Sequence, residues 1–258
     1  MEVHIALGGE FVRLKGRRLG CHVERASGVR GPVRGFSRQS RKRLFDFFAS
    51  LDRGGPSPTL LLTLTYPDAA YSEDWGVWKA HLQAFTRRFK RRYPGAAFVW
   101  RLEVKPRLSG EHIGELMPHF HLLVFGLDAV DKDWLSESWY EVVGSGDLKH
   151  LAAGTNCRRV KTWRGAAGYL TKDMAKVDVS HIATGRVWGV IARAVLLIRL
   201  VEVGLSPEQF YRMRRVLRAW LARRLKVKRL KWGRGRSDGL TCYMDSAGAV
   251  RLLAFVAS

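Results

Sequence analysis

Two histidines separated by one residue stand out in this sequence, because they lie in an otherwise apolar run. His119 and His121 flank Phe120 within residues 119–125, which end at a glycine. Alternate side chains of a β-strand point to the same face, so both imidazoles would lie on one side of a sheet. Two imidazoles on one face can share a divalent metal ion. A metal site is the first hypothesis, and a pair of hydrogen-bonded core histidines is the alternative.

A third ligand is expected from the apolar run that precedes the histidines. Glu103 lies in residues 96–105, and if this run pairs with residues 119–125 as a hairpin, the carboxylate faces the imidazoles. An acid in so apolar a strand needs a cation or a hydrogen-bond donor. The alternative to a metal is an ion pair with Arg101, which shares the face of Glu103. Weaker ligand candidates in the intervening loop are Glu111, His112 and Glu115.

A second reactive group lies in residues 164–176, where a helix is predicted. Tyr169, Lys172, Asp173 and Lys176 follow the spacing i, i+3, i+4 and i+7, so they share one helix face. Ammonium groups beside a phenol favour the phenolate, which is a competent nucleophile toward phosphorus. The alternative is a packed tyrosine with solvated lysines. Asp173 either pairs with a neighbouring cation or activates water.

Strands and helices alternate around these residues, which predicts an α+β fold with a central, mostly antiparallel sheet flanked by helices. Strands are expected at residues 59–66, 96–105, 119–125, 157–162, 187–191 and 195–203, and helices at residues 73–92, 131–142 and 164–176. Residues 206–209 (SPEQ) form a capping box that opens a basic helix to about residue 225. Residues 240–256 are expected to form a hairpin. Three parts are predicted: a basic segment 1–55, a catalytic domain 56–205, and a basic helix with the hairpin, 206–258.

The chain is strongly basic, with 45 Lys+Arg, 23 Asp+Glu and a formal net charge of +22. Such an excess usually faces a polyanion, and nucleic acid is the first partner to expect. Residues 206–236 hold 12 basic residues and one acidic residue, although a merely solvated basic face is the alternative. The candidate DNA contacts are Arg212, Arg215, Arg218, Arg223, Lys228 and Trp232, the last as a stacking platform for a base.

Several classes are disfavoured by what the sequence lacks. No GxxxxGK[ST] segment occurs, which argues against a P-loop ATPase or helicase. No run of about 18 apolar residues occurs, and no secretion signal is evident. The three cysteines lie far apart, which fits a reducing cytoplasm better than a disulfide framework or a zinc knuckle.

Three segments together resemble the HUH endonucleases, specifically the rolling-circle replication initiators (Rep proteins) of plasmids and bacterial viruses. They are residues 62–67 (LTLTYP), 118–123 (PHFHLL) and 168–172 (GYLTK), which appear in the order of the family motifs. Residues 185–189 (GRVWG) are similar to a further segment common in these initiators. The likeness extends over roughly residues 59–225.

This resemblance implies a ferredoxin- or RRM-like sheet with a metal on one face. His119 and His121 would be the histidine pair, Glu103 the upstream ligand, and Tyr169 the nucleophile, with Lys172 as the lysine of its motif. Mg²⁺ or Mn²⁺ would be the cofactor, and two imidazoles favour Mn²⁺. Asp173 departs from the pattern, since some members carry a second tyrosine at this position.

The implied activity is the nicking and rejoining of single-stranded origin DNA, with a 5′-phosphotyrosine link and a free 3′-OH that primes replication. The expected partners are origin DNA, a host helicase and polymerase in the bacterial cytoplasm, and a second subunit that could supply its own Tyr169. No membrane is expected. The competing hypotheses are a relaxase or transposase of the same superfamily, a zinc hydrolase, and a non-catalytic nucleic-acid-binding protein.

Overall fold

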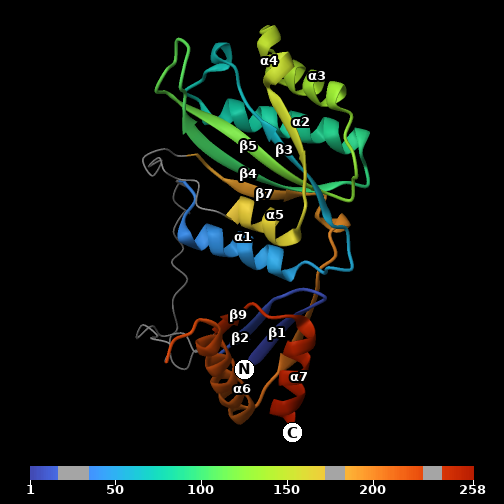
Figure 1. Cartoon of the computed structure of the whole chain (residues 1–258), viewed down its shortest axis with the longest axis vertical. Helices are drawn as coiled ribbons and strands as arrows, with labels where there is room; N and C mark the ends of the chain where they lie inside the picture. The colour runs from blue at the N-terminus through green and yellow to red at the C-terminus, as the bar shows by residue number, and fades with distance from the viewer. Residues whose placement is uncertain (17–34, 172–183, 229–239) are drawn as a thin grey trace, which may run out of the picture. The chain divides into compact units, whose positions relative to one another are not determined.

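The computed structural model describes residues 1–16, 35–171, 184–228 and 240–258 (Figure 1). The described residues form two compact units. The central unit takes its residues from 30–45 and 56–196, and the terminal unit takes its residues from 1–29, 46–55 and 197–258. Each unit is built on an open antiparallel sheet with helices packed against it, which confirms the predicted α+β class.

The sheet of the central unit has five strands in the order β6-β3-β5-β4-β7, and every neighbouring pair is antiparallel. The strands are β3 (Pro58–Leu64), β4 (Ala97–Pro106), β5 (Leu116–Phe125), β6 (Thr155–Arg159) and β7 (Trp188–Ile191). The predicted long hairpin is present as β4 and β5, whose register places Glu103 opposite His119 and Arg101 opposite His121. This register brings the candidate ligands onto one face.

Helices cover both faces of this sheet (Figure 1). They are α2 (Trp75–Arg92), α3 (Lys132–Val143), α4 (Leu148–Ala153), α5 (Trp163–Thr171), the first part of α1 (Arg38–Ser50) and the short 3-10 turns η1 (Asp68–Ala70) and η2 (Arg193–Val195). The apolar stripe of α2 buries Trp78, Leu82 and Phe89 in the same core as Phe120. Since Phe120 points into that core, the histidines on either side of it face the opposite side, where α5 packs on β3 and β5.

The terminal unit has a four-stranded sheet in the order β8-β1-β2-β9. Its strands are β1 (Glu2–Leu7), β2 (Val12–Lys15), β8 (Arg199–Gly204) and β9 (Leu240–Cys242), and its helices are α6 (Pro207–Arg224) and α7 (Ser246–Ala257). The predicted capping box is confirmed, because the Ser206 hydroxyl accepts from the Gln209 N–H and the Gln209 side chain accepts from the Ser206 N–H. Phe210, Met213 and Leu217 of α6 are buried in the core of this unit.

The hairpin predicted for residues 240–256 is wrong. Only Leu240–Cys242 form a strand, and Ser246–Ala257 form the helix α7. Asp245 was expected in a tight turn, but its carboxylate accepts a hydrogen bond from the Gly248 N–H and caps the helix. The alanines and leucines that follow favour the helix once this cap is made.

None of the helices in the described part of the chain has the length and apolar content that a bilayer span requires.

Candidate active site

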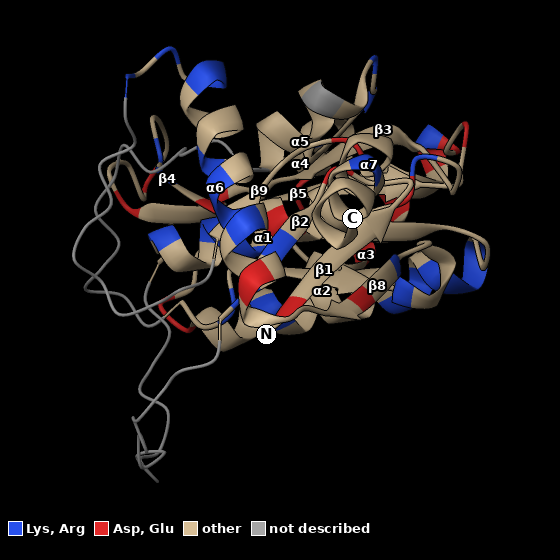
Figure 2. Ribbon diagram, turned by 90° about the horizontal axis from the view of Figure 1, so that it is seen from below, with Lys and Arg blue, Asp and Glu red and all other residues tan. Residues whose placement is uncertain are grey.

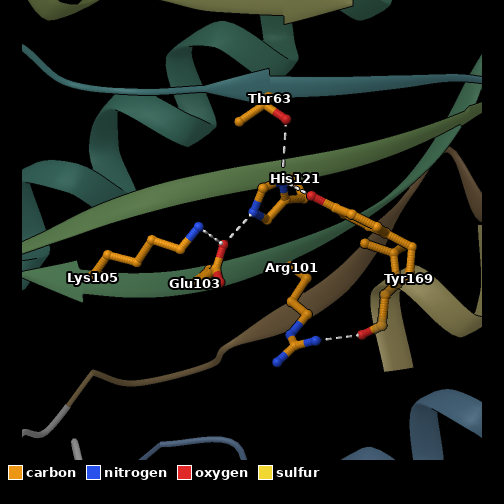
Figure 3. Close-up of polar contacts among 7 residues, drawn as sticks. Thr63, Arg101, Glu103, Lys105, His121 and Tyr169 are labelled. Carbon is orange, nitrogen blue, oxygen red and sulfur yellow. Dashed lines mark hydrogen bonds and ion pairs between the residues drawn. The ribbon is translucent and has the colours of Figure 1, made fainter. Parts of the chain in front are cut away.

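His121 lies at the centre of a polar cluster on the α5 side of the central sheet (Figure 3). Its side chain is buried in β5, and its Nε2 is 2.7 Å from Oε2 of Glu103 on β4. Its Nδ1 is 3.1 Å from Oγ1 of Thr63, the residue opposite it on β3. Both ring nitrogens therefore have polar partners, and the plane of the imidazole is fixed by two neighbouring strands.

Glu103 is the acidic member of this cluster and is also buried. Its Oε2 is 3.0 Å from Nζ of Lys105, two residues along the same strand. Burial acts to raise the pKa of Glu103, but hydrogen bonds from His121 and Lys105 outweigh it and leave the pKa below its ordinary value. The carboxylate is therefore ionised at neutral pH. The sequence had suggested Arg101 as its alternative partner, whereas the structure gives this position to Lys105 and His121.

His119 shares the face of His121 and is half-buried. Burial, followed by the positive charge of Lys105, lowers the pKa of His119 to about 4. The imidazole is therefore neutral at pH 7, which is the form that ligates a metal.

The ligand set fits a metal in part. Two ligands at right angles around an ion, with bonds of about 2.1 Å, lie about 3 Å apart, which agrees with the 2.7 Å between Glu103 Oε2 and His121 Nε2. His119 completes the set only if its ring turns toward these two atoms, because the three ligand atoms do not all lie within 4.8 Å of one another. Among the described residues, the groups that meet that limit are Glu2, His4 and Glu202 in the terminal unit, and Asp68, Glu111 and His112 in the central unit.

Tyr169 reaches this cluster from α5. Its hydroxyl is 3.5 Å from Nδ1 of His121, and the two rings meet edge to face with centroids 5.4 Å apart. The tyrosine side chain is 37% exposed, so the hydroxyl lies between the buried histidine and solvent. The helix and strand predicted separately from two motifs thus bring their reactive side chains together.

The ionisation expected for Tyr169 is not what the structure gives. Burial, followed by the negative charge of Glu103, raises the pKa of Tyr169 above its ordinary value. The expectation of an easily formed phenolate rested on Lys172 and Lys176. These residues and Asp173 lie outside the described residues, so their roles stay predictions.

Arg101 holds α5 in place, a role that the sequence reasoning missed. Its side chain is 3% exposed, and its Nη1 donates a 2.8 Å hydrogen bond to the carbonyl oxygen of Leu170, the residue after the tyrosine (Figure 3). Its guanidinium also lies 4.3 Å from the ring centroid of Phe36. A cation suits the carbonyls at the end of a helix. The signal in the sequence was a buried arginine on the face of Glu103 and His121.

Comparison with known protein families decides what this domain is. Residues 59–178 match the family model of the replication-associated proteins of the ORF2 type. This part of the chain belongs to that family. The match is consistent with a rolling-circle replication initiator. No curated protein and no solved structure gave a significant match.

The replication-associated domain, residues 59–178, contains the whole candidate site, since Thr63, Glu103, His119, His121 and Tyr169 all fall within it. A DNA-directed role for the chain follows from this family.

The predicted DNA contacts on α6 lie beyond the replication-associated domain and in the terminal unit. Arg215, Arg223 and Lys228 are exposed, and Figure 2 shows the basic turns of this helix in blue. Arg212 is half-buried, with its guanidinium 4.5 Å from the ring centroid of Phe255 on α7. Arg218 is also half-buried, and Trp232 lies outside the described residues.

Proposed function

We propose that this chain initiates rolling-circle replication by nicking single-stranded origin DNA through transesterification on Tyr169. The observation that carries the proposal is the Tyr169 hydroxyl 3.5 Å from His121, inside a domain of a replication-associated family. A nucleophile beside a cluster of two histidines and an acid is the arrangement that phosphoryl transfer to a side chain requires.

In the proposed reaction, the phenolic oxygen of Tyr169 attacks the scissile phosphorus in line with the leaving 3′ oxygen. The bond between phosphorus and that oxygen breaks, the DNA 5′ end becomes joined to the tyrosine, and the 3′ oxygen takes up a proton to leave as a hydroxyl. The proton of the phenol passes to solvent, which the partly exposed side chain permits. The phosphotyrosine link conserves the bond energy, so a later 3′-OH can reseal the strand.

The pKa of Tyr169 is raised in this site, so its attack needs help from positive charge. A divalent cation on Glu103, His119 and His121 would supply it by offsetting the charges of the phosphate, of the carboxylate and of the developing phenolate. Mg²⁺ and Mn²⁺ are the ions we propose, and the two imidazoles favour Mn²⁺. Thr63 and Glu103 fix the ring of His121 and so the position of this ligand.

Binding of the single strand is proposed to depend on the basic residues of α6 and the segment that follows it. Closure of the circle would need either Asp173 as a base that activates water or Tyr169 of a second subunit. The free 3′-OH would pass to a host polymerase, with a host helicase opening the duplex in the bacterial cytoplasm.

The test is a search for the covalent intermediate. Purified protein is incubated with single-stranded oligonucleotides from the origin region, with Mn²⁺ or with EDTA, and the products are digested and analysed by mass spectrometry. The proposal expects a metal-dependent adduct on the peptide that contains Tyr169. An adduct on another residue would remove Tyr169 from its role, and strand binding with no adduct on any origin oligonucleotide would leave a non-catalytic nucleic-acid-binding protein.

A further inference from the structure

A cavity of about 540 Å³ lies between α2 and the edge strand β7 of the central unit. Its volume is in the usual range of small-ligand pockets. It lies on the α2 side of the sheet, because Trp100, one of its walls, packs in the same core as Phe120. The Tyr169 helix packs against the other side of the sheet. The cavity is therefore separate from the candidate active site.

Two tryptophans form the aromatic part of the cavity wall. Trp100 is 8% exposed, and Trp75 is half-buried with its ring 4.7 Å from that of Trp78. The position of Trp100 depends on Gly189 of β7, because a Cβ at this glycine would lie 2.7 Å from Nε1 of the indole. Flat indole surfaces in a cavity suit the stacking of a planar ring.

The other part of the cavity wall is positively charged. Nζ of Lys79 lies 4.8 Å from the ring centroid of Trp100 and donates a hydrogen bond to the carbonyl oxygen of Arg186, which is a neutral acceptor. The guanidinium of Arg186 belongs to an exposed side chain at the rim. An ammonium group that is largely desolvated and bonded to a carbonyl attracts an anion more strongly than one in water. The exposed Gln83 adds an amide that can donate and accept hydrogen bonds.

We infer that this cavity binds one nucleotide, with the base against Trp75 and Trp100 and the phosphate at Lys79 and Arg186. The ligand is either a free nucleotide or one nucleotide of a single strand that passes the edge of the sheet at β7. The inference goes beyond the proposed nicking reaction and does not require it, since it concerns binding on the other side of the sheet.

The test measures binding of deoxyadenosine monophosphate and of a 12-nucleotide deoxyadenosine oligomer by calorimetry. EDTA is present throughout, so metal-dependent nicking cannot contribute. Lys79→Met removes the charge at nearly constant length, and Lys90→Met makes the same change at an exposed lysine of the same helix. Loss of a charge-assisted hydrogen bond should weaken binding about tenfold or more in the Lys79 variant. The Lys90 variant should stay within about twofold of the wild type for the mononucleotide.

The two ligands separate the two sources. Tenfold weaker binding of the mononucleotide identifies a site for free nucleotides, and a loss confined to the oligomer identifies a site for one nucleotide of a strand. Equal affinities of the wild type and Lys79→Met for both ligands would overturn the inference. If Lys79→Met does not fold, Gln83→Trp keeps the test, because an added indole on an exposed position of the rim fills the cavity and should weaken the same binding. Unchanged affinity in that variant would also overturn it.

Discussion

The hydroxyl of Tyr169 lies 3.5 Å from Nδ1 of His121, and the two rings meet edge to face. The tyrosine comes from α5 and the histidine from β5, so 48 residues separate them in the chain. This contact ties the chemistry of the tyrosine to the polar cluster of His121, Glu103 and Thr63.

Replacement of Tyr169 by phenylalanine removes one oxygen atom and leaves the ring contact with His121. We expect the fold to persist and the covalent DNA adduct to fall by about a thousandfold or more, as when a nucleophile is deleted. Tyr211→Phe is the matched control, because Tyr211 is exposed on α6 and lies outside the replication-associated domain. Gel analysis of the adduct checks both variants, and an adduct of wild-type yield in Tyr169→Phe would contradict the assignment.

Alanine at Glu103, His119 or His121 should weaken Mn²⁺ binding by at least about tenfold each. Affinity for single-stranded DNA should largely remain, because most of the basic residues lie elsewhere. Calorimetry with Mn²⁺ measures the first quantity and fluorescence anisotropy the second.

His112→Ala provides the discriminating control for that series. His112 belongs to the other compact group of possible ligands in the central unit, with Asp68 and Glu111. If Mn²⁺ binding is lost in His112→Ala and kept in the three variants above, the ion binds at that group instead.

Arg101→Met tests whether the hydrogen bond to the Leu170 carbonyl positions the nucleophile. The variant leaves a carbonyl at the end of α5 without this donor, at a cost of about 1–3 kcal/mol in the free energy of unfolding. Adduct formation should slow by about tenfold to a hundredfold, since small misplacements of reacting groups are costly, while Mn²⁺ affinity stays unchanged. Arg101→Lys should recover part of the rate, and Arg87→Met, at an exposed arginine of α2, should have no effect. An unchanged rate in Arg101→Met would refute the positioning role.

Binding of a nucleotide in the α2–β7 cavity should weaken at alkaline pH. Burial, followed by the charge of Arg186, lowers the pKa of Lys79 to about 8. The lysine is therefore mostly charged at pH 7 and loses its proton as the pH rises through 8, while Arg186 stays charged. A bound phosphate shifts this loss to higher pH, so affinity for deoxyadenosine monophosphate should fall between pH 8 and pH 10. In Lys79→Met the affinity should be lower and nearly independent of pH over this range.

The exposed arginines of α6 should contribute to DNA affinity through phosphate contacts. Each lost contact changes the slope of log affinity against log salt by about 0.7 for a single strand. We expect a change of about 1.4 when Arg215 and Arg223 are both replaced by alanine, and a smaller one when the exposed Arg87 and Arg91 of α2 are replaced. Equal slopes in both double variants and in the wild type would place the DNA away from α6.

The sequence predicted the site well where the information is local. The alternation in residues 119–125 and the apolar run of β4 placed Glu103 and His121 on one face, and the structure joins them by a hydrogen bond. The tyrosine face of α5 was predicted from helical spacing alone. Its docking against His121 was expected from the family resemblance and not from periodicity, because packing between distant elements leaves no local pattern.

The remaining features could not be predicted for the same reason. Periodicity does not reveal that β1 pairs with β8 nearly 200 residues away, and so the two ends of the chain were assigned to different parts. The side chain of Arg101 was expected to find Glu103 because the two share a face, but nothing in the strand pattern indicates the carbonyl of Leu170. Asp245 is equally common in tight turns and at helix starts, and the tertiary packing of α7 decides between them.

The pairing of β1 with β8, and of β2 with β9, has a consequence for synthesis of the protein on the ribosome. The first two strands leave the exit tunnel early, yet their sheet neighbours begin at Arg199 and Leu240. Both edges of the β1–β2 ribbon stay unpaired while the whole of the central unit, which ends at Leu196, is being made. Unpaired strand edges invite pairing with other chains. The nascent chain therefore has its longest period of aggregation risk at its first residues, and translation of the last sixty residues ends it.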